Sequence, residues 1–349
     1  MMLSNCKKII IISVILIQIN SSILSVSAVY TTNTQKNDIE LSVEPGNYYQ
    51  YILTDGHIRS YRLHIPPSYE DNSPMPLVLV LHGSGVGANS RSIKTYSDMD
   101  KKANEEGFIV VYPNGELLRL SRYLKHPIAR LWDLYYLIRA SREWNRWDDN
   151  NVDDVGYIRD LIKHLELKLN VNSSRIYITG FSGGAMMTYR LGAELSDQIA
   201  AIAPISGSIG GLGFETEKND SLSPYIISTP KNPLPVITFH GMQDISVPYE
   251  GGWKQVYNWK SYELWVYIVS VNESVTFWID NNNCNPVPEV KKSKSERIIT
   301  KTYINENGNS DVVLVTYIDG GHEWFKSPKH ELSAIDLLWE FFEQHPKHK

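Results

Sequence analysis

Cysteine is almost absent from this chain of 349 residues, which contains two. Cys6 falls in an N-terminal segment that we expect to be removed, so Cys284 would be the only thiol of the mature chain. A single thiol cannot form an intramolecular disulfide. We expect Cys284, which lies in an Asn-rich stretch, to be inert rather than catalytic.

An excess of positive charge and the common nucleotide motifs are also missing. The formal net charge is −5, which argues against a general nucleic-acid binder. No GxxxxGKS/T phosphate loop and no GxGxxG follows an expected strand. His322-Glu323 begins like a metalloprotease motif, but Lys326 stands where the second histidine is needed. We therefore expect no metal, no organic cofactor and no nucleic-acid partner.

The one long hydrophobic run lies at the N-terminus. Lys7-Lys8 precedes an apolar stretch from Ile9 to Ile19, and Val26-Ser27-Ala28 offers small residues for cleavage. This order is typical of a secretory signal peptide over residues 1–28. An uncleaved membrane anchor is the alternative, but the run is short for a bilayer and polar residues interrupt it. We expect a secreted protein without a stable membrane span after cleavage.

Strand-like and helix-like stretches alternate through the rest of the chain. Residues 29–44 are polar and predict a disordered lead-in. From residue 45 to residue 349, strands are expected at 48–53, 58–65, 76–81, 108–112, 175–179, 199–205, 235–240, 298–304 and 312–318. Helices are expected up to about 106 and at 154–169, 185–195, 271–280 and 334–342. This alternation predicts one α/β-hydrolase domain, a mostly parallel sheet with helices on both faces.

A serine follows one of these strands in a glycine-rich turn. Gly180-Phe181-Ser182-Gly183-Gly184 separates the strand from a helix, which is the context of a nucleophile elbow. Side chains at Gly180 and Gly184 would collide with the neighbouring backbone. Gly183 would offer its N–H to a developing oxyanion. A chance serine in a tight turn is the simpler alternative.

Two further strand ends carry an acid and a base. Asp244 follows the strand at 235–240, and His322 follows the strand at 312–318. Ser182, Asp244 and His322 thus occur in the order Ser, acid, His that this fold uses. The alternatives are a turn-capping Asp244 and a surface His322. Asp319 and Glu323 are rival acids, and His82 is expected to order the loop that follows it.

Several motifs together resemble the secreted polyhydroxybutyrate depolymerase and feruloyl esterase group, carbohydrate esterase family one. They are the segments 81–85, 108–115, 151–158, 180–191, 199–204, 240–252 and 320–324. The resemblance implies that Ser182, Asp244 and His322 form the triad and that the loop at Ser84 supplies the second oxyanion N–H. It also implies hydrolysis of feruloyl or acetyl esters of plant polysaccharide, or of short hydroxyalkanoate polyesters.

The chain departs from that group in two places. The cysteine that often pairs with the position of Cys284 is missing, so the disulfide is absent. The segment 116–142 is longer than expected and rich in Leu, Tyr, Trp and Arg, and 253–267 is also expanded. Each is expected to be a surface helix or a lid over the site. We assign Trp132, Tyr135 and Trp324 to substrate binding.

Other classes of protein remain open at this point. A non-catalytic polymer-binding protein could keep the fold, and a peptidase or lipase could use the same three residues. The sequence favours a serine carboxylic-ester hydrolase whose substrate is polymeric or derived from a polymer. It does not indicate an oligomeric state.

Overall fold

The first described element is a β-hairpin with a two-residue turn, Asp55-Gly56. β1 (Gly46–Thr54) and β2 (His57–Ile65) pair antiparallel, as the alternating pattern predicts. Asp55 and Gly56 join them with φ angles of 47° and 74°, which suit Asp and Gly. The hairpin forms one edge of a large sheet.

The computed structural model describes residues 44–85, 87–117, 142–144, 152–215, 217–259, 262–306 and 311–347, all within one unit, Val43–Lys349. The signal peptide predicted over 1–28, the lead-in predicted over 29–44 except for its last residue, and residues 118–141, including Trp132 and Tyr135, lie outside these ranges. Within them, no helix combines the length and the apolar character that a membrane crossing needs.

Among the described residues, the large sheet has ten strands, of which the middle six run parallel. Its order is β1-β2-β4-β3-β7-β8-β11-β16-β15-β14. The parallel strands are β4 (Ile109–Pro113), β3 (Met75–Leu81), β7 (Val171–Phe181), β8 (Ala201–Ile205), β11 (Val236–Gly241) and β16 (Val312–Tyr317). β15 (Ile298–Tyr303) and β14 (Glu289–Lys292) close the other edge antiparallel. Continuous apolar runs form the buried middle strands, because both faces of the sheet are covered.

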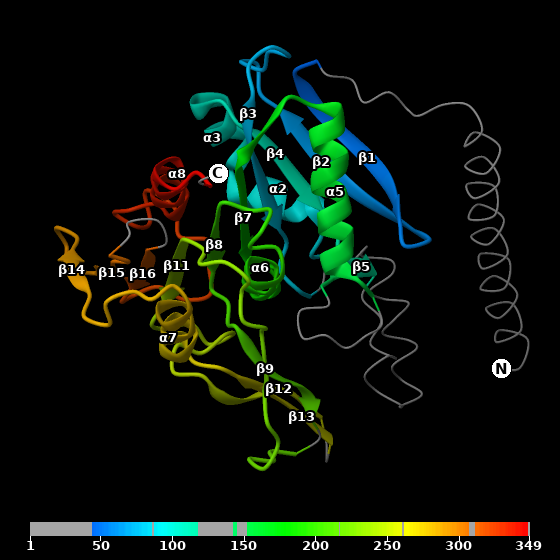
Figure 1. The fold of residues 1–349 in the computed structure, drawn as a ribbon. Helices are drawn as coiled ribbons and strands as arrows, with labels where there is room; N and C mark the ends of the chain where they lie inside the picture. The colour runs from blue at the N-terminus through cyan, green and yellow to red at the C-terminus, as the bar shows by residue number, and fades with distance from the viewer. Residues whose placement is uncertain are drawn as a thin grey trace, which may run out of the picture. The chain divides into compact units, whose positions relative to one another are not determined.

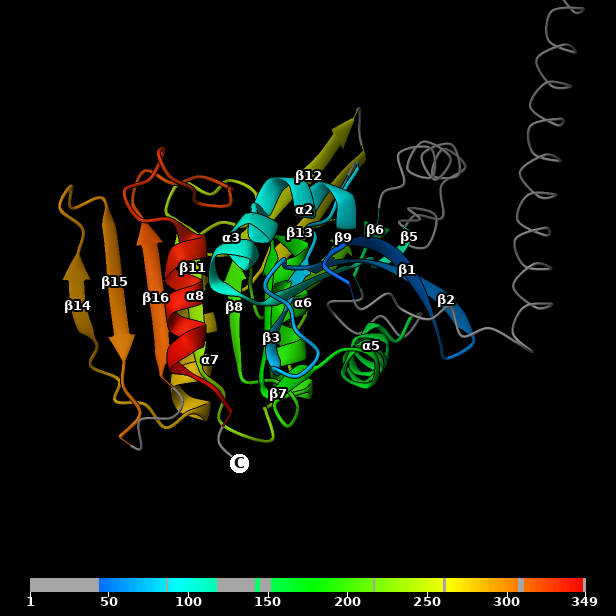
Figure 2. The ribbon, with the colours of Figure 1, turned by 90° about the horizontal axis from the view of Figure 1, so that it is seen from above.

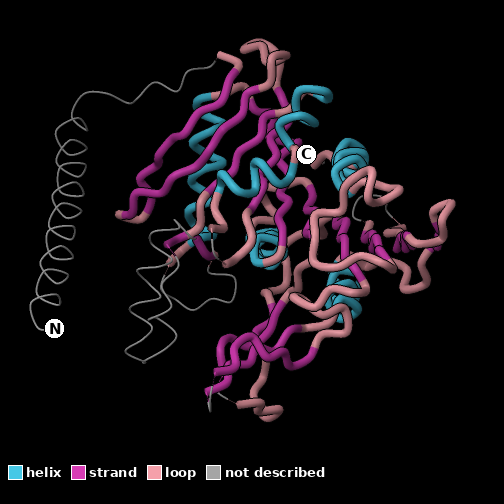
Figure 3. The backbone as a smooth tube through the Cα atoms, turned by 180° about the vertical axis from the view of Figure 1, so that it is seen from behind, coloured by secondary structure: helices cyan, strands magenta, loops and turns pink. Residues whose placement is uncertain are grey.

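Helices cover both faces of this sheet, as predicted. α5 (Asp154–Lys168), α6 (Gly183–Glu194) and α7 (Val271–Asn281) lie in front of the sheet in Figure 1. α2 (Ser90–Ser97), α3 (Met99–Glu106) and α8 (Ala334–Gln344) lie on the opposite face, which Figure 3 shows from behind. The expected helix up to residue 106 is broken at Asp98, whose φ of 58° and ψ of 20° are left-handed. The arrangement is the α/β-hydrolase fold.

A second, antiparallel sheet was not predicted. Its order is β10 (Tyr225–Ile226), β9 (Gly210–Glu215), β13 (Tyr262–Ile268) and β12 (Gly252–Trp259). Figure 1 shows β9, β12 and β13 below the large sheet, and in Figure 2, seen from above, the end of β12 projects beyond it. The expected helix over 253–267 is therefore wrong: its described residues form two strands. Alternate residues explain the difference, because Leu264, Val266 and Ile268 all point to a buried side.

The second sheet is attached beside the elbow. Val266 and Ile268 of β13 form a buried cluster with Met186 of α6 and Val247, which follows Asp244. The long insertion also begins and ends in paired strands, β5 (Glu116–Leu117) and β6 (Arg142–Glu143). Both features therefore lie next to segments that the sequence assigns to the site.

Candidate active site

Ser182 occupies a strained turn between β7 and α6. Its φ of 57° and ψ of −119° lie outside the regions that non-glycine residues normally adopt. The turn is fixed on both sides, because Ser182 N–H donates to Ile205 O at 3.0 Å and Met186 N–H donates to Ser182 O at 3.0 Å. Strain of this kind persists only where the surroundings enforce it, and it is common at functional sites.

Glycines make this turn possible, as the sequence predicts. A β-carbon placed on Gly180 would lie 2.5 Å from the carbonyl oxygen of Gly184. One placed on Gly184 would clash with the carbonyl oxygens of Leu81 and His82. The close approach of β7, α6 and the end of β3 therefore leaves no room for side chains at these two positions.

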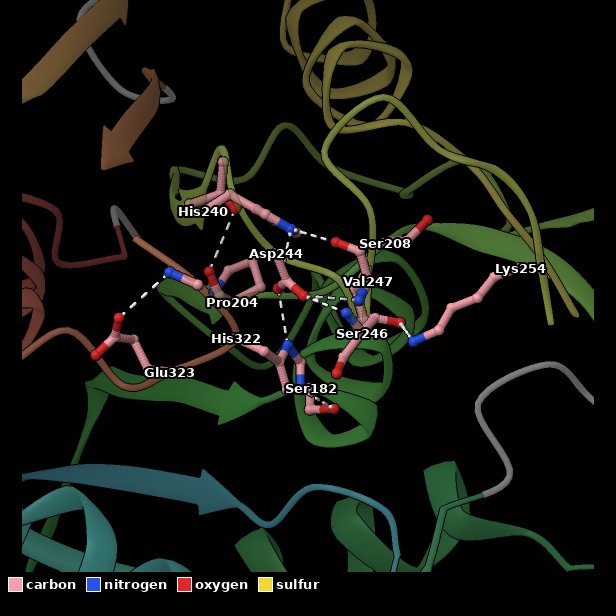
Figure 4. A network of polar contacts seen from close by, with 12 residues as sticks. Ser182, Pro204, Ser208, His240, Asp244, Ser246, Val247, Lys254, His322 and Glu323 are labelled. Atoms are coloured by element: carbon pink, nitrogen blue, oxygen red, sulfur yellow. Dashed lines mark hydrogen bonds and ion pairs between the residues drawn. The ribbon is translucent and has the colours of Figure 1, made fainter. Parts of the chain in front are cut away.

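The structure brings Ser182, His322 and Asp244 together. His322 Nε2 lies 2.9 Å from Ser182 Oγ, and His322 Nδ1 lies 2.7 Å from Asp244 Oδ2. Figure 4 shows the His322 ring between the hydroxyl and the carboxylate. The acceptor at Nδ1 favours the tautomer with its proton on that nitrogen, which leaves Nε2 free to accept the serine proton. This geometry would allow Ser182 to act as a nucleophile, His322 as a general base and Asp244 as the acid that orients it.

The Asp244 carboxylate is held by its own loop. Its Oδ1 accepts the N–H groups of Ser246 and Val247 at 2.7 and 2.8 Å. Burial acts to raise the pKa of Asp244, but hydrogen bonds from His240, His322 and the Val247 N–H lower it below its ordinary value. The group therefore stays ionised where an imidazolium opposite it would need a negative charge.

Sequence reasoning did not assign a role to His240. Its side chain is fully buried, and Nε2 lies 2.8 Å from Val247 O and 3.5 Å from Asp244 Oδ2. Lys254 of β12 donates to Ser246 O at 2.9 Å from the other side of the loop. The acid loop is thus held by β11 and by the second sheet. The four-residue spacing of His240 and Asp244 was the only signal in the sequence.

The oxyanion side is built from α6 and the loop after β3. A β-carbon on Gly183 would lie 3.2 Å from Ser84 N, so the loop amide stands beside the first residue of α6. The loop also packs on the elbow, since a β-carbon on Gly83 would lie 3.3 Å from Ser182 Cβ. The structure therefore places the two residues assigned to an oxyanion hole, Gly183 and Ser84, side by side next to the serine.

His82 orders this loop rather than acting on the serine. Its Nε2 accepts the Gly115 N–H at 3.0 Å, so Nδ1 carries the proton and donates to Gly83 O at 2.7 Å. Trp144 stacks on the ring at 4.8 Å, and its indole N–H donates to His82 O at 2.9 Å. Gly115 and Trp144 flank the long insertion, so both of its ends meet at His82.

The rival acids are used elsewhere. Asp319 is half-exposed and forms an ion pair with Arg297 at 3.0 Å. Glu323 binds Lys329, with a shortest distance of 2.6 Å, and accepts the Gly321 N–H at 3.3 Å. Neither carboxylate has a described contact with the His322 ring, whereas Asp244 has one.

Of the three residues predicted to bind substrate, Trp324 alone lies within the described residues. Trp324 is 2% exposed and belongs to the hydrophobic core, so in this structure its ring presents almost no surface to a ligand. Trp132 and Tyr135 lie outside the described residues. An apolar residue next to His322 can belong to the hydrophobic core or line a binding site, and the sequence alone does not distinguish the two.

The described residues contain neither a cluster of metal ligands nor a reactive thiol. In the described part of the chain, no three His, Cys, Asp or Glu side chains cluster closely enough to hold a metal ion. Cys284 is buried, and burial together with the Asp311 charge raises its pKa to about 11. A protonated, buried thiol is a poor nucleophile.

Comparisons with known proteins agree with the fold. The profile of the phospholipase/carboxylesterase family matches residues 69–262. Feruloyl esterase C of Emericella nidulans is 25% identical over 311 residues, which cover 85% of this chain and 90% of that protein. A bifunctional acetylxylan esterase/xylanase of Neocallimastix patriciarum is 26% identical over 57% of this chain, which spans only 23% of that longer protein.

Among solved structures, the acetyl xylan esterase from Aspergillus awamori is similar with a TM-score of 0.50. The match covers 85% of this chain and 99% of that one at 14% sequence identity. At this identity the likeness concerns the fold alone.

Proposed function

The chain belongs to the phospholipase/carboxylesterase family, a family of carboxylic ester hydrolases, and from this premise we propose that it is a secreted serine esterase with Ser182, His322 and Asp244 as its triad. The proposal depends above all on one observation: a single imidazole connects the strained Ser182 hydroxyl at 2.9 Å with the buried Asp244 carboxylate at 2.7 Å.

The proposed reaction is acyl transfer through Ser182. Oγ attacks the ester carbonyl carbon while its proton passes to His322 Nε2, and the carbonyl oxygen becomes an oxyanion. The N–H groups of Gly183 and Ser84 would stabilise that oxyanion, and Asp244 would stabilise the imidazolium. His322 then protonates the departing alcohol. Water attacks the acyl-enzyme with His322 as base, and the acid product leaves as Ser182 regains its proton.

For the substrate, we propose feruloyl or acetyl esters of plant polysaccharide. The names of the relatives support this class, because they include feruloyl esterases and an acetylxylan esterase.

The proposal of secretion depends on residues 1–28. Mass spectrometry of the protein recovered from culture medium would test it, with a mature N-terminus near Val29 as the expected result.

A hydrolysis panel on the purified mature chain tests the substrate class. Methyl ferulate, acetylated xylan, hydroxybutyrate oligomers and a peptide amide would be compared by kcat/KM. Turnover of the first two at rates well above the others is expected. Preferential release of hydroxybutyrate would make the chain a polyester depolymerase, and cleavage of the amide without ester hydrolysis would make it a peptidase.

A further inference from the structure

An aromatic row runs from the surface of α2 to the proposed base. Tyr96 is 41% exposed, and its ring centroid lies 5.6 Å from that of Phe181. Phe181 is half-buried, and its ring lies 4.8 Å from the His322 ring at an angle of 37°. Three segments that are distant in sequence therefore place Phe181 beside the proposed base and Tyr96 beside Phe181.

The Phe181 ring also touches the oxyanion side. A β-carbon on Gly83 would lie 3.6 Å from Phe181 Cδ1. The ring thus lies between the loop that carries Ser84 and the loop that carries His322, and it precedes Ser182 in the chain. A group bound at this ring would therefore lie close to Ser182.

The Tyr96 ring is fixed in place. Its hydroxyl accepts the backbone N–H of Trp324 at 3.2 Å, and Lys326 Nζ lies 5.3 Å from the ring centroid. Lys326 is itself held by an ion pair with Asp98 at 2.6 Å. An exposed ring that is already ordered loses little conformational freedom when a ligand stacks on it. A planar aromatic group is the ligand that such a surface favours, since ring pairs attract beyond their buried area.

We propose that Tyr96 and Phe181 form a subsite for an aromatic ring carried by the ester substrate, on the acyl or the alcohol side. The inference depends on the proposed esterase function and adds residues that determine specificity. It predicts a preference for hydroxycinnamoyl or other aryl esters over esters without a ring. A purely structural role is the alternative, in which Tyr96 only supports the His322 loop through its hydroxyl.

Two substitutions separate these roles. Tyr96→Phe keeps the ring and removes the hydrogen bond from Trp324, whereas Tyr96→Ala removes both. Tyr49→Ala is the matched control, because it removes a tyrosine of similar exposure, 43%, from β1. For each variant, kcat/KM would be measured with methyl ferulate, benzyl acetate and methyl acetate.

The expected result is a fall of about tenfold in selectivity for a ring-bearing ester over methyl acetate in Tyr96→Ala. Tyr96→Phe and Tyr49→Ala should keep the wild-type selectivity. Loss confined to methyl ferulate places the ring on the acyl side, and loss confined to benzyl acetate places it on the alcohol side. Either pattern supports the subsite.

An equal fall for all three esters in both Tyr96 variants, or unchanged selectivity in Tyr96→Ala, would overturn the inference while esterase activity itself remained. Absence of turnover of every ester by the wild-type protein would instead contradict the proposed function.

A binding measurement adds a readout that is independent of turnover. Ser182→Ala protein should bind ferulate, and adding Tyr96→Ala should weaken that binding about tenfold.

Discussion

Asp244 and His322 are 78 residues apart in sequence, yet their side chains meet at 2.7 Å because β11 and β16 are neighbours in the sheet. The pairing places the carboxyl ends of the two strands side by side, and the acid and the base follow these ends. Active sites of open α/β sheets lie beyond this edge. The relationship gives the account a direct mutational test.

Replacing Asp244 by Asn should lower kcat by roughly 10⁴ in a protein that still folds, because an amide favours the wrong histidine tautomer. Asp319→Asn is the matched control: this carboxylate is exposed and bound to Arg297, and its loss should leave kcat nearly unchanged. Steady-state kinetics on a simple acetyl ester measures both. A large effect of Asp319→Asn with a mild effect of Asp244→Asn would show that the acid is misassigned.

The Asp244 carboxylate should also stabilise the fold over a defined pH range. Its pKa is below the ordinary value of 3.8, so the folded state binds its proton less readily than the unfolded state does. The stabilisation is then fully present above about pH 3.8 and is lost as the pH falls through the lower, folded pKa.

Urea unfolding at a series of pH values measures this contribution. The difference in unfolding free energy between wild type and Asp244→Asn should shrink as the pH falls below about 4, because the wild-type carboxylate then takes up its proton. A difference that stays constant as the pH falls from about 4 to about 2 would contradict a folded-state pKa below the ordinary value.

Gly180→Ala should damage the elbow. The new β-carbon would lie 2.5 Å from Gly184 O and 2.8 Å from Thr188 Oγ1, so the backbone must shift. We expect a loss of roughly 1–3 kcal/mol in unfolding free energy together with most of the activity. Gly213→Ala in β9 is the control, because no described residue other than Gly213 and its two chain neighbours places a heavy atom within 4 Å of the added β-carbon. Similar stability and activity for the two variants would refute the steric account of the turn.

Most of the large sheet and the three central site residues could be predicted from the sequence. Continuous apolar runs such as Leu77–Leu81 identify strands buried on both faces. Ser182 follows the end of its strand directly, and Asp244 and His322 lie in the loops that follow theirs. The glycines around Ser182 carried the steric signal for the elbow. Local patterns were sufficient here because each reacting side chain lies at a strand end.

The rest depended on contacts that sequence patterns do not record. β9 contains three glycines and pairs with β13, about 50 residues later, so its strand signal is weak until the partner is known. The position of Trp324 in the core and the exposure of Tyr96 are likewise set by packing between distant segments. The break at Asp98 contains neither Gly nor Pro, and no local signal predicted it.

The most direct test of the central claim is the turnover of Ser182→Ala. The elbow tolerates the smaller side chain, so the variant should fold with an unchanged melting temperature, and kcat for a simple acetyl ester should fall by on the order of 10⁶. Intact mass spectrometry after a fluorophosphonate probe should show one adduct on wild type and none on the variant. A correctly folded Ser182→Ala protein that keeps substantial turnover, or still takes up the probe, would contradict the assignment of Ser182 as the nucleophile.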